Sequence, residues 1–331
     1  MAGKRTAVGR ATTRRVVVVA YAGAELLDIA CITSTLALAN LIGRLRPRYD
    51  ISVVSLGARP IVCDSGLTLQ PHQALERTIG PLDSIIVTGG LGHLAAAGEA
   101  ALTSHVRRLA RESRRVASVC TGASVLAEAG LLNGRRATTH WRFAGEMASR
   151  YRTVAVDPDP IYIRDGNVLT SAGVTSALDL TLALVEEDHG VRLARQVSRD
   201  LVTYLQRPGS QAQMSVYTAP VPAENDVVRQ AVDYILAHLD GDLSTVRLAA
   251  AVGVSSRHLS RIFVQHVGQA PGRYIRRARI DAVARLLATT STPVSEIATR
   301  CGFGTTEALR QAFVATYGIP PARYRATQSA H

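Results

Sequence analysis

Short apolar runs recur through the first half of the chain, and longer segments of mixed polarity separate them. The runs show little polar alternation, which is typical of strands buried on both faces of a parallel sheet. The expected strands span residues 15–21, 51–56, 84–87, 115–119 and 136–139, with paired strands at 62–69 and across 162–171. The expected helices span residues 24–45, 99–113, 121–129, 143–149, 176–187 and 191–205. Strands that alternate with helices predict an α/β domain with a parallel sheet.

The last third of the chain has a different pattern, in which apolar positions recur at helical spacing. After an expected helix at 226–239, two segments share one arrangement: an alanine, a glycine four residues later, and then a polar residue followed by apolar positions. Ala249 and Gly253 begin the first copy, and Ala298 and Gly302 begin the second. A small alanine lets two helices approach closely, and glycine ends the first helix cheaply in the left-handed conformation.

Each copy therefore predicts a helix-turn-helix, at about 244–265 and at about 294–315. A polar cap is expected to start the second helix of each copy, at Ser255 or Ser256 and then at Thr305. One such pattern fits a plain helical hairpin equally well. Two copies whose glycines lie 49 residues apart, with a helical run between them, are far more specific.

The outward face of each second helix is polar. Arginine, serine and glutamine side chains can bind base edges and phosphates in a major groove, so we expect double-stranded DNA as the partner. The candidate DNA-binding residues are Ser256, Arg257, His258 and Arg261 in the first copy and Thr305, Thr306, Glu307 and Arg310 in the second.

Residues 225–326 resemble the AraC/XylS family of DNA-binding domains. The resemblance rests on the two motifs and on the C-terminal run GFGTTEALRQAFVATYGIPPARYR. It implies two helix-turn-helix units on one connecting helix, which enter successive major grooves roughly 34 Å apart on one face of the duplex.

The charge of the chain agrees with a nucleic-acid partner. The net charge is +12, and Lys4 is the only lysine among the 38 basic residues. Residues 226–331 carry 13 arginines against 7 acidic residues, which is a large excess for a short region. An arginine-rich overall composition would raise the charge as well, so charge alone does not decide. The arginines at 107, 108, 111, 114 and 115 are expected on a solvated helix face.

The chain shows no sign of a metal site, a disulfide framework or a membrane anchor. Its four cysteines are scattered without a CxxC pair: Cys31, Cys63, Cys120 and Cys301. Residues 1–14 are expected to form a disordered basic tail, and Glu25 and Asp28 interrupt the apolar run that follows. We therefore expect a cytoplasmic protein with no metal, no cofactor and no membrane partner.

The most informative segment of the first half is RRVASVCTGASVLAEAGLLNGRRATTHW. An expected strand stops at Cys120, two small residues follow, and a helix begins, as in an elbow that lifts a side chain above a sheet. The positive end of the helix dipole would favour the thiolate form of this cysteine. Gly89 and Gly90, after a neighbouring strand, could present backbone N–H groups to an anion or a carbonyl.

Residues 15–190 resemble the PfpI-like, class I amidotransferase-like superfamily. The resemblance places Cys120 on the family's elbow cysteine, Asp28 on an acidic residue that hydrogen-bonds it, and His140 on a histidine near it. Hydrolases of that family carry a histidine directly after the cysteine, where this chain has Thr121. The elbow is therefore expected to be vestigial, with no catalytic residue. The domain is expected either to be purely structural or dimerising, or to keep a small-effector pocket formed by Asp28, Gly89, Gly90, Cys120, Thr121, His140 and Trp141.

The order of these parts is itself informative. A PfpI-like α/β parallel-sheet sandwich, a helix and linker at 191–225, and an all-α tandem helix-turn-helix domain at 226–331 resemble the GlxA family of transcriptional regulators. The resemblance implies a sequence-specific, DNA-binding homodimer that senses a small effector, with RNA polymerase as a further partner of an activator. The alternatives are a Cys120-dependent amidase, hydrolase or glyoxalase-like enzyme with an attached DNA-binding domain, and a redox sensor that acts through a Cys120 sulfenate.

Overall fold

The computed structural model divides the chain into two compact units, Met1–Gln213 and Met214–His331. It describes residues 13–203, 207, 209, 211, 213 and 225–328. Most of the expected tail, residues 1–12, lies outside this description, and its last residue, Arg14, already belongs to the first strand. The predicted boundaries between tail, domain and linker otherwise stay predictions.

The first unit is built on a seven-stranded sheet with the order β10-β11-β7-β6-β1-β2-β5. Every neighbouring pair is parallel except the β10–β11 hairpin. The strands are β1 (Arg14–Val19), β2 (Tyr49–Ser55), β5 (Gln73–Ala74), β6 (Leu82–Val87), β7 (Ser113–Ser118), β10 (Tyr162–Asp165) and β11 (Val168–Ser171). The predicted parallel sheet of an α/β domain is thus confirmed.

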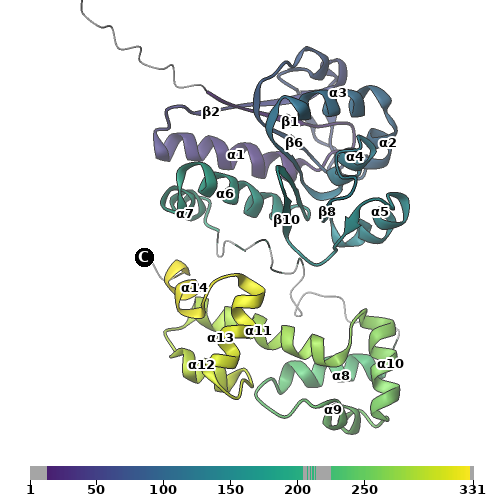
Figure 1. The fold of residues 1–331 in the computed structure, drawn as a ribbon, viewed down its shortest axis with the longest axis vertical. Coiled ribbons are helices and arrows are strands. Elements are labelled where there is room, and N and C mark those ends of the chain that lie inside the picture. Colours follow the sequence, from purple (N-terminus) through teal and green to yellow (C-terminus); the bar gives the residue numbers. More distant parts are fainter. Residues whose placement is uncertain are drawn as a thin grey trace, which may run out of the picture. The chain divides into compact units, whose positions relative to one another are not determined.

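Helices cover both faces of this sheet, which explains why its strands lack polar alternation. Along β1, Val17 and Val19 pack into one apolar cluster and Val16 and Val18 into the other. The first cluster lies beneath α2 (His93–Gly98), α3 (Ala100–Arg111), α4 (Ala123–Glu128) and α5 (Ala144–Arg150). The second lies beneath α1 (Leu26–Gly43), α6 (Thr175–His189) and α7 (Val191–Asp200), which Figure 1 shows together on one side of the sheet.

Helix α1 is long and apolar enough to cross a membrane by those two criteria alone. Its contacts identify a core helix instead, because it packs against β2, α6 and α7. Ile29, Ile32 and Leu36 are buried in the cluster beneath these helices. The apolar character of α1 is therefore accounted for by the core of the first unit.

Several short elements complete the first unit. The expected hairpin at 62–69 is present as β3 (Ile61–Val62) and β4 (Thr68–Leu69). The expected strand at 136–139 is only β8 (Arg136–Ala137), and it pairs with β9 (Ala155–Val156) outside the main sheet. Sequence patterns did not indicate α2 or β5, since both are too short to show a period.

One expectation about the first unit is corrected, and one segment makes contacts that the sequence did not indicate. Arg114 and Arg115 lie on β7 rather than on a solvated helix face, and Arg115 is almost completely buried. Arg207, Gly209, Gln211 and Gln213, expected in a linker, form hydrogen bonds with this unit. In both cases acidic or backbone partners far away in the sequence hold the residues in place.

The second unit is entirely helical in its described part. Its helices are α8 (Asp226–Ala237), α9 (Thr245–Ala251), α10 (Ser256–Val267), α11 (Pro271–Thr289), α12 (Val294–Arg300), α13 (Thr306–Tyr317) and α14 (Pro321–Gln328). The long helix α11 contacts α8 and α10 as well as α12, α13 and α14 (Figure 1). The two predicted helix-turn-helix pairs, α9–α10 and α12–α13, are therefore mounted on one connecting helix.

Candidate nucleic-acid interface and elbow site

The first helix-turn-helix is built as its sequence predicts. Gly253 has φ of 71°, the left-handed conformation that ends α9. The Ser255 side chain then accepts a hydrogen bond from the backbone N–H of His258 at 3.2 Å, which decides between the two expected caps. Leu259 and Ile262 lie on the buried face of α10. The opposite face of α10 is consequently turned to solvent.

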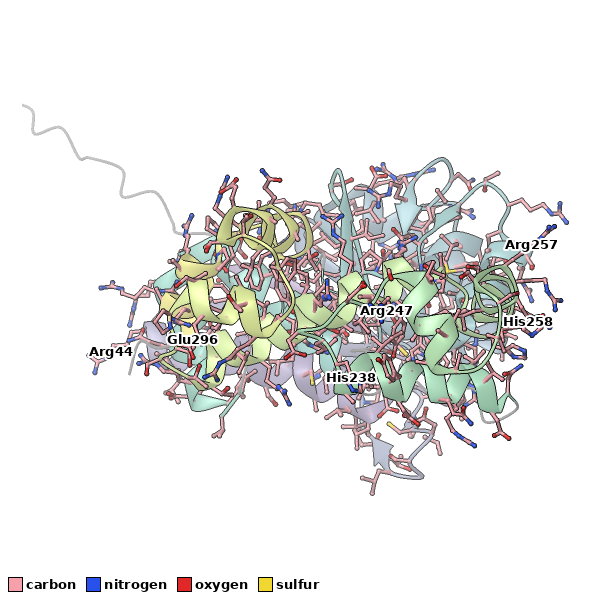
Figure 2. All side chains as sticks on the ribbon, turned by 90° about the horizontal axis from the view of Figure 1, so that it is seen from below. Arg44, His238, Arg247, Arg257, His258 and Glu296 are labelled. Carbon is pink, nitrogen blue, oxygen red and sulfur yellow. The ribbon has the colours of Figure 1, made fainter. Side chains whose placement is uncertain are left out.

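That solvent-facing surface of α10 carries only basic and neutral groups. Arg257, His258 and Arg261 are exposed and Ser256 is half-buried. Figure 2 shows Arg257 and His258 at the outer surface of the second unit. The guanidinium of Arg261 lies 3.3 Å from Nδ1 of His258, and α10 contains no acidic residue. This face presents positive charge and several hydrogen-bond donors, as phosphate and guanine recognition requires.

The second helix-turn-helix has the same frame and a different charge. Gly302 has φ of 68°, Thr305 accepts a hydrogen bond from the N–H of Ala308, and Leu309 is buried. On the exposed face, the guanidinium of Arg310 donates two hydrogen bonds of 2.8 Å to the carboxylate of Glu307. This contact lowers the pKa of Glu307. Arg310 is thus neutralised on its own helix, beside the exposed hydroxyls of Thr305 and Thr306.

Arg279 on α11 fixes the second turn to the rest of the unit, a role that the sequence did not reveal. Its guanidinium donates hydrogen bonds to the carbonyls of Leu239 at 2.9 Å and Gly241 at 2.7 Å. A Cβ atom on Gly302 would lie 2.6 Å from the same guanidinium. Because any larger residue would displace Arg279, Gly302 serves both the turn and the contact between α8, α11 and α12. No local pattern marks one arginine among the many of α11.

The elbow of the first unit lies at the carboxyl end of β7. Cys120 has φ of 52°, which is unusual for a residue with a side chain, and its N–H donates to the carbonyl of Ala172 at 3.3 Å. Backbone packs closely around it: a Cβ on Gly89 would lie 2.3 Å from Cys120 Cβ, and a Cβ on Gly173 would lie 2.5 Å from its Sγ. The expected strand–cysteine–helix turn is present, and glycines enclose it.

Thr121 and Asp28 hold the backbone of the neighbouring loops. The Thr121 hydroxyl donates to the carbonyl of Gly90 at 2.8 Å and accepts from its N–H at 2.9 Å. The fully buried carboxyl of Asp28 accepts from the N–H groups of Gly89 at 3.0 Å and Val174 at 2.9 Å. The N–H groups of Gly89 and Gly90, expected to face a ligand, are therefore already occupied.

The surroundings of Cys120 favour the protonated thiol over the thiolate that the helix dipole would favour. Burial is the largest cause that raises its pKa to about 12, and the nearby carboxyl of Asp28 raises it further. The turn after Cys120 is a short 3₁₀ segment, Cys120–Gly122, before α4 begins, so a long helix dipole does not act on the sulfur.

His140 and Trp141 approach the elbow from the loop after β8. A Cβ on Gly173 would lie 2.9 Å from His140 Cδ2 and 2.5 Å from Cys120 Sγ, so the absence of a side chain at Gly173 lets the His140 ring and the thiol lie near each other. The hydroxyl of Thr139 donates to the Cys120 carbonyl at 2.9 Å, whereas Trp141 is 45% exposed at the rim. The structure thus gathers the predicted pocket residues at one edge of the sheet. Gly173, Val174 and Thr139 also belong there, and a glycine two residues after the end of a strand was the available signal.

Replacing Asp28 with asparagine should change how stability depends on pH. Burial raises the pKa of this carboxyl to about 7, so the folded state holds a proton that the unfolded chain releases near pH 4. Stability from this group is therefore present below about pH 4 and is lost as the pH rises toward 7. The difference in unfolding free energy between wild type and Asp28→Asn should fall by up to about 4 kcal/mol across that range.

Urea unfolding at several pH values, followed by the fluorescence of Trp141, the single tryptophan, measures this difference. Asp50→Asn is the matched control, because Asp50 is exposed and its removal should leave the profile unchanged. Parallel profiles for wild type and Asp28→Asn would show that Asp28 keeps an ordinary pKa.

Comparison with known proteins agrees with this architecture. Residues 14–187 match the DJ-1/PfpI family, and residues 248–327 match a helix-turn-helix domain family. The chain is 32% identical over 281 residues to the HTH-type transcriptional regulator CdhR of Pseudomonas aeruginosa, covering 84% of this chain and 82% of that protein. It is 27% identical to the HTH-type transcriptional regulator GlxA of Rhizobium meliloti, covering 91% and 92% of the two chains.

The first unit also has relatives that carry no such regulator name. It is 35% identical over 155 residues to the isonitrile hydratase of Pseudomonas putida, which covers 47% of this chain and 66% of that enzyme. A solved THiJ/PfpI family protein from Pseudomonas syringae shares the fold with a TM-score of 0.54 at 24% identity, over 76% of this chain and 96% of that one. Since the match to the regulators CdhR and GlxA extends through both units, the chain belongs to the DJ-1/PfpI family and, within it, to the GlxA-like transcriptional regulators that carry an AraC-type helix-turn-helix domain.

Proposed function

We propose that the protein is a sequence-specific, DNA-binding transcription regulator that acts in the cytoplasm. The observation that carries this proposal is the pair of capped helices, α10 and α13. Both contact the connecting helix α11, and each has one exposed face. Arg257, His258 and Arg261 would read one major groove, and Thr305, Thr306 and the Glu307–Arg310 pair would contact the next. The family membership of the chain supports the same function.

The first unit, on this proposal, binds a small effector at the elbow and forms a homodimer. Support comes from the likeness of both units to HTH-type transcriptional regulators and from the tight packing of Gly89 and Gly173 against Cys120, which a bound group would have to displace. Such an arrangement is sensitive to a ligand that seats between Cys120 and His140, because protein interiors transmit small displacements. If the regulator activates transcription, RNA polymerase is its further partner.

Titration of a labelled duplex tests the proposed function directly. The probe is the DNA upstream of the protein's own gene and its neighbours, with a random duplex of equal length as control and with salt varied. We expect the specific duplex to bind at least about a thousand times more tightly than the random one. Equal binding to both duplexes, in the presence and absence of a cell-extract small-molecule fraction, would contradict a sequence-specific regulator.

Replacing Glu307 with glutamine should strengthen DNA binding. The carboxylate of Glu307 holds the guanidinium of Arg310 and would face the negatively charged duplex. Its removal frees one positive charge and removes one negative charge, so we expect affinity for any duplex to rise several-fold and the salt dependence to steepen by about one to two ion equivalents. Glu296→Gln on α12 provides the control, since Glu296 pairs with Arg300 on its own helix, outside α13. A lower affinity for Glu307→Gln would mean that Glu307 itself reads a base.

We propose further that the elbow is not a catalytic centre, although the isonitrile hydratase is a relative of the first unit. The proposal is supported by Thr121, whose hydroxyl is engaged with Gly90, and by the raised pKa of the Cys120 thiol. Wild type and Cys120→Ala should give the same background rate with an isonitrile, a small amide and a 2-oxoaldehyde. Turnover of an isonitrile, a small amide or a 2-oxoaldehyde that is lost in Cys120→Ala would establish the enzyme instead.

A further inference from the structure

The last described residues of the first unit run along the edge strand of its sheet. The carbonyl of Gly209 accepts from the N–H of Tyr162 at 3.2 Å, and the carbonyl of Gln211 accepts from Ile161 at 2.8 Å. A Cβ on Gly209 would lie 2.5 Å from the Tyr162 ring, so only glycine permits this approach. Because β10 is the edge of the sheet, these residues extend the sheet's hydrogen bonding beyond its last strand.

Gln213, the last residue of the first unit, is hydrogen-bonded to both neighbours of His140. Its side-chain Nε2 donates to the carbonyl of Thr139 at 2.7 Å, and its Oε1 accepts from the N–H of Trp141 at 2.8 Å. Thr139 in turn donates through its hydroxyl to the carbonyl of Cys120. The carboxamide of Gln213 thus connects the last residue of the first unit to the loop that carries His140 and, through Thr139, to the elbow.

Arg207 makes the equivalent connection to the other loop of the elbow. Its backbone N–H donates to the Asp179 carboxylate at 2.8 Å, and its guanidinium lies 2.7 Å from the second oxygen. The same guanidinium donates to the hydroxyl of Thr175 at 2.8 Å. Asp179 is only 3% exposed, and a carboxylate so deeply buried needs an opposite charge to stay ionised. Thr175 directly follows Gly173 and Val174, which contact Cys120 and Asp28.

We propose that Arg207 and Gln213, together called the clasp, transmit the occupancy of the elbow pocket to the DNA-binding unit. This inference rests on the proposed function of that pocket as the effector site. A ligand seated between Cys120 and His140 displaces the 139–141 loop or the 173–175 loop, and the hydrogen bonds of the clasp no longer fit. With the clasp open, the point at which the chain leaves the first unit moves from Gln213 back toward Asp200, the end of α7. The effective concentration of one DNA-binding unit near its half-site then changes.

The substitution Gly173→Ala imitates the unknown ligand, because it adds a group between Cys120 and His140. The added methyl would lie 2.5 Å from Cys120 Sγ and 2.9 Å from His140 Cδ2, so the Cys120 side chain and the His140 ring must shift, as they would around a ligand. Gln213→Ala opens the clasp directly and leaves the pocket unfilled. Gln211→Ala is the matched control in the same stretch, because Gln211 contributes its backbone carbonyl and its side-chain oxygen has no hydrogen-bond partner among the described residues.

Hydrogen–deuterium exchange of the full chain measures whether the hydrogen bonds of the clasp are formed, and the measurement needs no DNA. We expect Gln213→Ala to raise exchange at Trp141, Ile161 and Tyr162 by about tenfold. Gly173→Ala should produce the same increase at Ile161 and Tyr162, and the double variant should add nothing further. Gln211→Ala should match wild type.

DNA titration with the specific duplex then reads the consequence. Gly173→Ala and Gln213→Ala should shift affinity in the same direction, each by at least about threefold, and the double variant should equal Gln213→Ala alone. Unchanged exchange at Ile161 and Tyr162 in a folded Gly173→Ala protein, or fully additive effects, would overturn the clasp. Wild-type protein that binds no duplex specifically would refute the proposed function, whereas the exchange data would still decide whether pocket and clasp are coupled.

Discussion

A double variant, Arg257→Ala with Arg261→Ala, should lose about 2–6 kcal/mol of binding free energy for the specific duplex, because each arginine that contacts a base pair well contributes about 1–3 kcal/mol. Both side chains are exposed on α10, which carries no acidic residue to neutralise them. Binding to a random duplex should weaken much less, since it depends on the total positive charge near the phosphates. Fluorescence anisotropy at one fixed salt concentration measures both affinities.

A charge-matched control separates base reading from simple electrostatics. Arg229→Ala with Arg300→Ala removes the same formal charge from the second unit, at exposed positions paired with Asp226 and Glu296 outside α10 and α13. This control should affect the specific and random duplexes alike. If the α10 variant also lowered both affinities by the same factor, its arginines would be phosphate contacts and the specificity would have to reside on α13.

The helix-turn-helix pairs were predictable because their determinants are local. Gly253, Ser255, Gly302 and Thr305 act through φ and through capping bonds three residues away, so a single sequence contains the full signal. The unequal charge of the two exposed faces was only partly visible. Glu307 and Arg310 lie three residues apart on a helix, where pairing is expected, but the sequence does not show that both Nε and Nη2 of the arginine are engaged.

The elbow was located from the sequence, whereas its chemistry was not. A strand that ends at Cys120 before two small residues indicates the turn. The protonation of the thiol depends instead on Gly89, Asp28 and Gly173, which the parallel sheet brings together from distant parts of the chain. Burial by such residues outweighs the dipole of a short helix. The same reason explains why a Pro-, Gln- and Ser-rich stretch read as a linker although Arg207 and Gln213 are bound to the first unit.

The positions of the arginines of β7 also depend on contacts with residues far away in the sequence, which sequence patterns do not show. Arg115 reads as one of five arginines in a helix-like run, yet it lies near the amino end of a parallel strand, where the start of β6 and the end of α6 bring acidic residues together. Its guanidinium contacts Asp83 at 3.0 Å and Asp188 at 2.7 Å. The side chains of Arg115 and Asp188 are 3% and 2% exposed, and Asp83 is 9% exposed. These arginine contacts hold the pKa values of both carboxyls below their usual range despite burial.

Replacing Arg115 with methionine should therefore destabilise the first unit by about 3 kcal/mol, because Asp83 and Asp188 lose the most buried of their arginine partners and keep Arg14 and Arg114. Arg114→Met is the internal comparison: Arg114 contacts the same two aspartates but is 41% exposed, so water replaces part of its interaction and the loss should be nearer 1 kcal/mol. Urea unfolding followed by Trp141 fluorescence reports on the first unit alone.

The cause of that loss can be separated from simple loss of packing. Adding Asp83→Asn and Asp188→Asn to Arg115→Met removes two buried carboxylates, which in Arg115→Met still have Arg14 and Arg114 as ionic partners. It should recover part of the lost stability, because amides are far less costly to bury than carboxylates. Lowering the pH of the Arg115→Met variant should have a similar effect, since the freed carboxyls then bind protons. A triple variant no more stable than Arg115→Met would assign the loss to the arginine's packed side chain. The charges at this end of the sheet would then determine which side chains pair there and would contribute little to the free energy of unfolding.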